Sequence, residues 1–330
     1  RTPGNLILDA PDIWNWEYLN SLQGAHTIYD MVITPEGIIF AATGDLNGDV
    51  FKSTDMGNTW DTTANIVWAK WVYGLLFSKD SLLYAAYVKS NFQPCVAYSN
   101  NPDSGWNLTG IPEKAVYCVV EAENYLFTGV GIYGANIYIS IDGGNTWLFK
   151  TGFNDDKILC MCAVTPQLLL AGTGDSKGYV SRGLSIVGKM VTLDSLNCGI
   201  ETIIGEASGL AFLGTSDGRV FVSEDSGLTW TETSPLPGAN SVKSLVFDDK
   251  KIIYAGANAT GNQAEVYFSG DKGLSWDKSG EILGRSSILS LLGFESGFMV
   301  AGTNIDASVF RAGYFQYGHI ISKPYFTGAT

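Results

Sequence analysis

The chain has 330 residues, with 20 lysine and arginine residues against 33 aspartate and glutamate residues, which gives a net charge of −13. A chain this acidic lacks the basic surface expected of a nucleic-acid-binding protein or a polybasic membrane anchor. No stretch approaches the roughly 20 consecutive apolar residues of a transmembrane helix. Only 16% of the residues are charged, whereas 39 are glycine and 16 are tyrosine, a composition typical of an all-β protein with tight turns.

The N-terminal part of the chain contains the first sign of a repeat. Trp16 lies 13 residues before Tyr29, and the same interval separates a tryptophan from a predicted inner-strand residue in three later places. These pairs are Trp60 and Tyr73, Trp230 and Lys243, and Trp276 and Leu289. The segment 12–22 is therefore predicted to form the outer strand of the last repeat, which would close a ring and remove an open sheet edge.

Further along the chain, an apolar run, a turn and a short β run ending in small residues recur seven times, from residues 38–43 to residues 298–303. The period is about 43 residues, and four predicted strands per period are typical of a propeller blade. The predicted blades cover residues 26–67, 68–113, 114–156, 157–198, 199–239, 240–285 and, for the last blade, 286–318 together with 12–22.

A second phrase, Ser-x-Asp-x-Gly-x-Thr/Ser-Trp, follows the third predicted strand of four repeats. Its members are Asp55, Gly57 and Trp60; Asp142, Gly144 and Trp147; Asp225, Gly227 and Trp230; and Asp271, Gly273 and Trp276. A degraded copy runs from Ser99 to Trp106. The aspartate can accept hydrogen bonds from turn N–H groups, the glycine can adopt a positive φ, and the tryptophan offers a large surface to bury.

This phrase resembles the Asp-box, or bacterial neuraminidase repeat, of the sialidase-like β-propellers, and the resemblance covers nearly the whole chain. It implies one all-β domain over residues 1–330, a seven-bladed β-propeller of four-stranded antiparallel blades closed by the N-terminal strand. In that family the box is a structural element of the hairpin between the third and fourth strands, away from the ligand face.

Sialidase chemistry is not expected from this sequence. The resemblance would require three arginines that bind the substrate carboxylate, one of them in an Arg-Ile-Pro motif. The five arginines are Arg1, Arg182, Arg219, Arg285 and Arg311, and none of them precedes Ile-Pro. Arg182, Arg219 and Arg311 fall at or beside third strands and are expected to be solvated edge residues.

Two carboxylates are weak catalytic candidates. Aligning the predicted inner strands places Asp30 level with Tyr117, and Tyr29 level with Tyr73, Glu201 and Lys243. Only Asp30 and Glu201 are acidic, and they belong to the first and fifth blades, so the close carboxylate pair of a glycosidase is not expected. Loop residues such as Asp45 or Asp175 could add a carboxylate, which leaves a glycoside hydrolase as the alternative function.

The candidate ligand-binding residues are mostly aromatic and are predicted near the mouth of the ring. They are Tyr29, Asp30, Trp68, Trp71, Tyr73, Tyr117, Glu201 and Lys243. Exposed aromatic rings in that place could stack on sugar rings or peptide groups. Packing of several of them between blades, which need large apolar side chains, is the favoured alternative.

The function predicted from the sequence is a noncatalytic binding or scaffold propeller that recognises a glycan or a protein on one face. We expect a secreted or extracytoplasmic monomer, without nucleic-acid partners or a membrane span. Two histidines and five cysteines without a Cys-x-x-Cys pair predict no metal site, and no cofactor is predicted.

Overall fold

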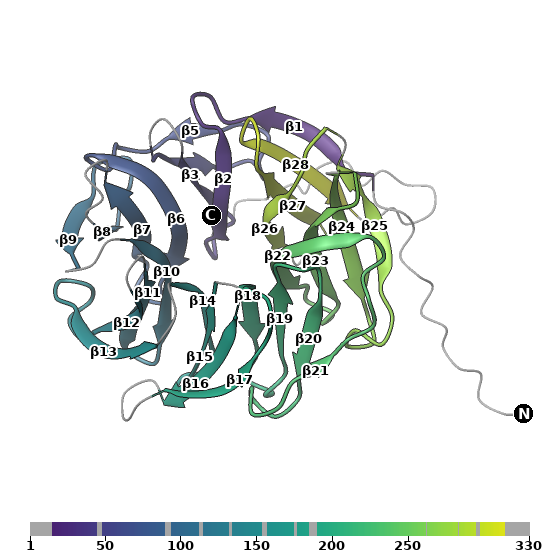
Figure 1. Cartoon of the computed structure of the whole chain (residues 1–330). Coiled ribbons are helices and arrows are strands. Elements are labelled where there is room, and N and C mark those ends of the chain that lie inside the picture. The colour runs from purple at the N-terminus through teal and green to yellow at the C-terminus, as the bar shows by residue number, and fades with distance from the viewer. Residues whose placement is uncertain are drawn as a thin grey trace, which may run out of the picture.

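The computed structural model describes residues 15–44, 48–89, 94–111, 115–131, 134–153, 157–174, 177–184, 190–261, 263–282, 284–294 and 298–313. The regular secondary structure of these ranges consists of 28 β-strands, and Figure 1 shows their sheets arranged around a ring. These ranges contain no helix that is long and apolar enough to cross a membrane.

The strands form antiparallel units of four in chain order. Unit one comprises β2 (Thr27–Ile33), β3 (Ile39–Gly44), β4 (Val50–Ser53) and β5 (Asp61–Thr62). Unit two comprises β6 (Ala69–Phe77), β7 (Leu83–Lys89), β8 (Pro94–Ser99) and β9 (Asn107–Gly110). Unit three comprises β10 (Val116–Ala122), β11 (Tyr125–Val130), β12 (Ala135–Ser140) and β13 (Leu148–Phe153). A single pair, Gly44 with Trp71, joins units one and two into one eight-stranded sheet.

The second half of the chain continues this pattern. Unit four comprises β14 (Ile158–Thr165), β15 (Leu168–Thr173), β16 (Tyr179–Leu184) and β17 (Val191–Ser195). Unit five comprises β18 (Ile200–Gly205), β19 (Ala211–Thr215), β20 (Val220–Ser223) and β21 (Thr231–Glu232). Unit six comprises β22 (Ala239–Phe247), β23 (Ile253–Ala259), β24 (Gln263–Ser269) and β25 (Asp277–Ile282). The 28 strands thus fit about seven blades.

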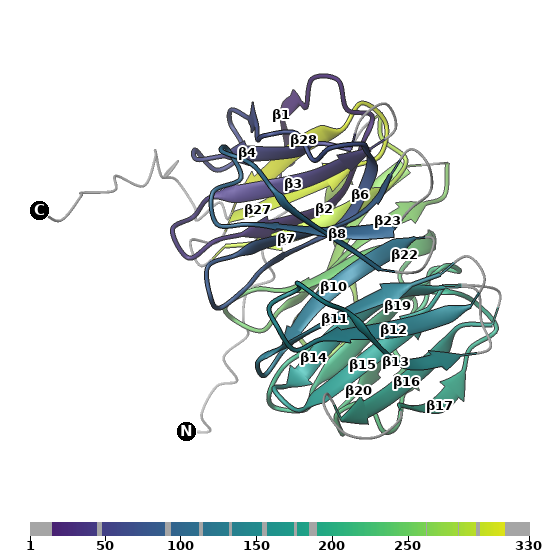
Figure 2. The same ribbon diagram turned by 90° about the vertical axis from the view of Figure 1, so that its left-hand side faces the viewer.

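The last unit combines both ends of the described chain. It comprises β26 (Ile288–Gly293), β27 (Phe298–Thr303), β28 (Ser308–Gly313) and β1 (Glu17–Ser21). β1 pairs antiparallel with β28, with Glu17 opposite Arg311 and Ser21 opposite Ser308, and the two strands lie side by side in both views (Figure 1, Figure 2). The strand nearest the N-terminus therefore supplies the outer edge of the last sheet.

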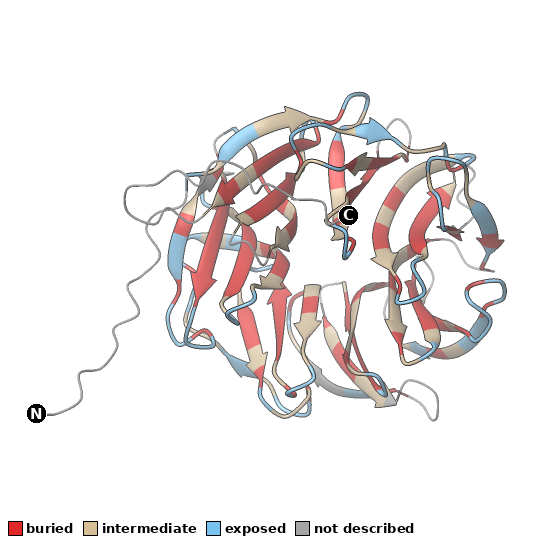
Figure 3. Ribbon diagram, turned by 180° about the vertical axis from the view of Figure 1, so that it is seen from behind, coloured by how far each residue is buried: buried red, intermediate tan, exposed pale blue. Residues whose placement is uncertain are grey.

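Adjacent units pack through a small residue on the second strand of each. A Cβ built on Gly172 would lie 2.6 Å from Cγ2 of Ile200, the β-branched residue that opens the inner strand of the next unit. The same glycine contact recurs in four other units, at Gly129 with Ile158, Gly214 with Val242, Gly256 with Ile288 and Gly302 with Ile28. The small residues that end each second β run thus make room for the next unit, and these strands are buried on both faces (Figure 3).

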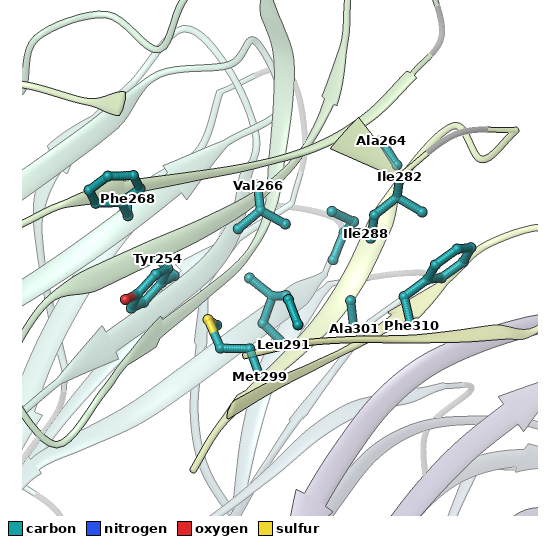
Figure 4. Close-up of a cluster of buried hydrophobic side chains, with 11 residues drawn as sticks. Tyr254, Ala264, Val266, Phe268, Ile282, Ile288, Leu291, Met299, Ala301 and Phe310 are labelled. Atoms are coloured by element: carbon teal, nitrogen blue, oxygen red, sulfur yellow. The ribbon is translucent and has the colours of Figure 1, made fainter. Parts of the chain in front are cut away.

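The apolar core consists of clusters that lie between neighbouring units. Figure 4 shows one of them, in which Tyr254 and Val266 of unit six meet Ile288, Leu291 and Met299 of the last unit. Each unit therefore depends on its neighbours for burial, because one four-stranded sheet cannot cover its own faces.

The four repeated turns have nearly the same hydrogen bonds. In the turn after β4, Asp55 accepts the Thr59 N–H through Oδ1 at 2.8 Å and the Thr59 hydroxyl through Oδ2 at 2.7 Å. The Ser53 Oγ accepts the Gly57 N–H at 2.9 Å. In the turn after β20, the Thr229 hydroxyl and N–H lower the pKa of Asp225 to about 2. The aspartates therefore bind turn backbone, as the sequence predicted.

These turns also connect neighbouring units. In the turn after β4, the Asn58 carbonyl accepts the Asn20 amide at 2.8 Å, and its Oδ1 accepts Arg311 Nη1 at 3.2 Å. In the turn after β20, the Ser226 carbonyl accepts Arg182 Nε of the preceding unit at 3.0 Å. The third-strand arginines, predicted to be solvated edge residues, are partly exposed, but they also make contacts that the sequence did not reveal: Arg182 and Arg311 bond to these turns and Arg219 pairs with Asp217 at 2.9 Å.

Candidate functional site

Each inner strand contains a β-bulge near its start. Pairing with the second strand skips an equivalent residue in every unit, and β6, β14 and β22 each skip a second one elsewhere. The equivalent residues are Tyr29, Tyr73, Tyr117, Leu159, Glu201, Lys243 and Leu289. A bulge leaves one residue outside the ladder and redirects its side chain. Tyr117 therefore belongs to the register of Tyr29 and Tyr73, and Cys118 belongs to that of Asp30. The alignment that placed Tyr117 level with Asp30 was wrong by one residue.

The first three bulges bring aromatic rings together. The ring centroids of Tyr29 and Tyr73 are 5.0 Å apart, and those of Tyr73 and Tyr117 are 5.2 Å apart. Trp71 stacks on Tyr73 at 6.4 Å with an interplanar angle of 22°. We call these four residues, which are all partly exposed, the aromatic ladder. The rings contact one another across three units, so the structure brings these predicted ligand residues together.

Gly44 packs closely against two rings of the aromatic ladder. A Cβ at this position would lie 2.5 Å from Trp71 Cδ1 and 2.7 Å from Tyr29 Cε2. A side chain here would have to displace both rings. Gly44 therefore belongs to the site, although the sequence offered it only as one of many glycines.

Trp68 lies in the turn just before β6 and is the one aromatic residue among the ten described non-glycine residues that have a positive φ. Its side chain is 67% exposed, the adjacent Val67 is 48% exposed, and the φ of Trp68 is +65°. The turn is closed by the Ala69 N–H on the Ile66 carbonyl at 2.9 Å. A bulky residue with positive φ costs roughly 1–2 kcal/mol.

The corresponding turn of unit six has a glycine at this position. There the Ala239 N–H bonds to the Leu236 carbonyl at 3.2 Å, and the residue with positive φ is Gly238, at +83°. A tryptophan thus occupies a glycine position and still exposes most of its ring. Aligning the two turns in the sequence would have revealed this substitution.

Two lysines lie beside the exposed indoles. Lys70 Nζ is 4.1 Å from the centroid of the Trp71 ring, and Lys89 Nζ is 5.7 Å from the centroid of the Trp68 ring. Both distances suit cation–π contacts. They add positive charge to an aromatic surface of an otherwise acidic protein, and the sequence analysis did not identify either lysine.

Asp30 joins three inner strands. Its Oδ1 accepts the Met31 N–H and its Oδ2 accepts the Leu75 N–H of unit two, both at 2.8 Å. Ser290 of the last unit also hydrogen-bonds to the carboxyl group. Burial among protein atoms raises the pKa of Asp30 to about 7, although these hydrogen bonds oppose the shift. Ser244 occupies the equivalent place in unit six and accepts the Leu291 N–H of the next unit at 3.0 Å.

Glu201 and Lys243 are paired with each other. Lys243 Nζ of β22 lies 2.6 Å from Glu201 Oε1 of β18, with both side chains less than a third exposed. Asp30 and Glu201 thus have separate partners in different units. The loop carboxylates considered with them, Asp45 and Asp175, lie outside the described residues.

The described part of the chain contains no group of three or more His, Cys, Asp or Glu side chains placed to hold a metal ion. Its polar groups near the inner-strand bulges instead bond to backbone or to each other. The arrangement offers a stacking surface, with hydrogen-bonding and cationic groups at its edge.

Comparisons with known proteins identify the fold alone. The sequence matches no protein-family model and no curated protein. YCF48 bound to a D1 peptide aligns with a TM-score of 0.68 at 13% identity, over 93% of this chain and 97% of that chain. YCF48 from Cyanidioschyzon merolae gives the same TM-score and identity over 91% and 98% of the two chains. The WD40 β-propeller domain of Doa1 has a TM-score of 0.68 at 12% identity, over 90% and 97%. The predicted all-β propeller is confirmed.

Proposed function

We propose that this chain is a noncatalytic binding propeller that recognises a segment of a protein partner through Trp68 and the aromatic ladder. The observation that carries the proposal is the conformation of Trp68. The residue is 67% exposed at a φ of +65°, so the folded chain gains little burial in return for the backbone strain. A partner that buries the indole would supply the missing stabilisation.

Several features support a protein as the partner. Tryptophan and tyrosine are the residues most enriched in the energetic centres of protein interfaces. The ladder includes Trp71, three residues after Trp68, and its rings contact one another across three units. Lys70 and Lys89 add cationic groups for a carboxylate of the partner. Among proteins of this fold, YCF48 is known bound to a D1 peptide. Sugars also stack on aromatic rings, so a glycan is the second outcome to test.

The proposal includes the finer architecture of the domain. We infer a closed seven-bladed ring of the Asp-box class over one domain, with β1 as the last strand. The β1–β28 pairing, the Gly302–Ile28 contact and the bonds of Asn58 to Asn20 and Arg311 support closure. The repeated turn bonds support the Asp-box assignment.

The sharpest test is the substitution Trp68→Gly. Glycine adopts positive φ without strain, so this variant should be as stable as the original protein or more stable by about 1 kcal/mol. It should nevertheless lose its partner in quantitative pull-downs from the source cells. Leu274→Ala is the matched control. Leu274 is also largely exposed, at 79%, but it lies in the repeated turn between β24 and β25 of unit six, away from the turn that contains Trp68.

Other outcomes would change the proposal. Equal recovery of the same proteins by both variants would contradict a role for Trp68. Binding to a glycan array that disappears in Trp68→Gly would retain the site but replace the protein partner by a sugar. Polysaccharide hydrolysis that disappears in Asp30→Asn or Glu201→Gln would establish the glycoside hydrolase instead.

A further inference from the structure

A cavity of about 640 Å³ lies between the outer strands of units three and four, which are neighbours in Figure 2. Its lining includes Phe149, Lys150 and Phe153 of β13, Tyr179 of β16, and Met190 and Thr192 beside and on β17. The volume falls within the roughly 300–1,000 Å³ of typical small-molecule sites. The aromatic and methionine side chains make most of this lining apolar.

Lys150 enters the cavity because of a β-bulge. Ile137 and Tyr138 of β12 pair with Thr151 and Phe149, which leaves Lys150 outside the ladder. The same bulge occurs in β25 of unit six, where the skipped residue is Ser279 and is fully buried. The bulged position therefore faces inward, and in unit three it carries a cationic side chain.

The ammonium group of Lys150 lacks a carboxylate partner among the described residues. Its Nζ lies 5.8 Å from the ring centroid of Phe127, a fully buried residue of the core between units three and four. Burial lowers the pKa of Lys150. Lys278 of unit six differs from Lys150 in having a carboxylate partner, since its Nζ lies 2.7 Å from the buried carboxylate of Glu265.

The surface around the cavity is also apolar. Phe149 is 61% exposed, and the neighbouring Leu148 and Val191 are 54% and 59% exposed. A largely apolar lining around a cation that has no carboxylate partner among the described residues is complementary to a molecule that has an acid group at one end and a hydrocarbon body. A neutral apolar ligand would leave the desolvated charge of Lys150 unpaired.

We propose that this cavity binds a small organic acid with an apolar body, whose acid group is held by Lys150 and whose body lies against Phe149, Phe153 and Met190. The site is separate from Trp68 and the aromatic ladder, so it does not depend on the function proposed for them. An aliphatic carboxylate of medium chain length satisfies both the charge and the apolar lining.

The test compares decanoate with decanol by isothermal titration calorimetry. The original protein should bind decanoate at least about tenfold more tightly than decanol, since a charge-assisted hydrogen bond is worth about 1.5–3 kcal/mol. Lys150→Met should remove this preference by weakening decanoate binding, while decanol should bind as tightly as before or more tightly. Lys150→Arg should retain it, and Lys272→Met, which changes an exposed lysine in a repeated turn, should have no effect.

Thermal denaturation of the same variants checks their folding. Lys150→Met should melt at the same temperature as the original protein or higher, because it removes a partly buried charge that no described carboxylate compensates. The proposal fails if decanoate does not bind, if both ligands bind equally, or if folded Lys150→Met retains the preference for decanoate.

Discussion

At the scale of single residues, the burial of Asp30 makes the stability of the fold depend on whether its carboxyl group is protonated. Its pKa of about 7 is above the value of about 3.9 for an unfolded chain, so the native state binds the proton more tightly between these values. The contribution of Asp30 to the free energy of unfolding is therefore fully present below about pH 4 and is lost as the pH rises to about 7. The decline can reach about 1.4 kcal/mol per pH unit.

Asp30→Ser should remove this decline. Serine can accept the Leu75 N–H as Ser244 accepts the Leu291 N–H, so the fold should persist. Urea denaturation of both proteins at several values between pH 4.5 and 8 gives the difference in their free energies of unfolding. We expect the original protein to lose stability relative to Asp30→Ser as the pH rises; parallel curves would show that Asp30 does not titrate in this range.

At the scale of structural elements, the repeated turns hold neighbouring units together. Gly227 has a φ of +81°, and a Cβ on it would lie 2.6 Å from Leu170 Cδ2 of the preceding unit. Gly227→Ala should therefore lower the free energy of unfolding by about 1–3 kcal/mol through backbone strain and overpacking. Gly270→Ala is the control in a sister turn, because a Cβ there meets no atom within 4 Å. Equal melting temperatures for the two variants would refute this role.

At the scale of the whole molecule, β1 is predicted to close the ring. Deleting residues 1–22 exposes the backbone of β28 and removes the Asn20 bond to Asn58. The shortened protein should melt at a lower temperature and self-associate in analytical ultracentrifugation. A synthetic peptide of residues 15–22 should restore its melting temperature, whereas a scrambled peptide should not. An unchanged melting temperature after the deletion would show that β1 is dispensable.

Features that repeat along the chain could be predicted from the sequence. Features that arise where a single unit departs from the repeat could not. Periodic apolar runs and the Asp-x-Gly phrases were sufficient to predict the strands and the turn bonds. The bulges were not visible, because an extra residue in one strand changes side-chain direction without changing the composition. For that reason Tyr117 was assigned to the wrong register, and Lys150 was not recognised as a residue that faces inward. Trp68 was identified as aromatic, but its significance depends on φ, which only the structure gives.

The small residues of the second strands determine which units can be neighbours. Gly129 and Gly172 face Ile158 and Ile200, whereas the first two units have alanine at this position, with Val72 and Val116 in the same core clusters. Isoleucine faces glycine in every such contact, whereas valine occurs both against glycine, as at Gly214 with Val242, and beside the alanines of the first two units. Gene duplication or recombination could therefore not insert units in any order. A unit that begins with isoleucine would overpack against alanine, and this matching restricts how such a chain can gain, lose or exchange a blade during evolution.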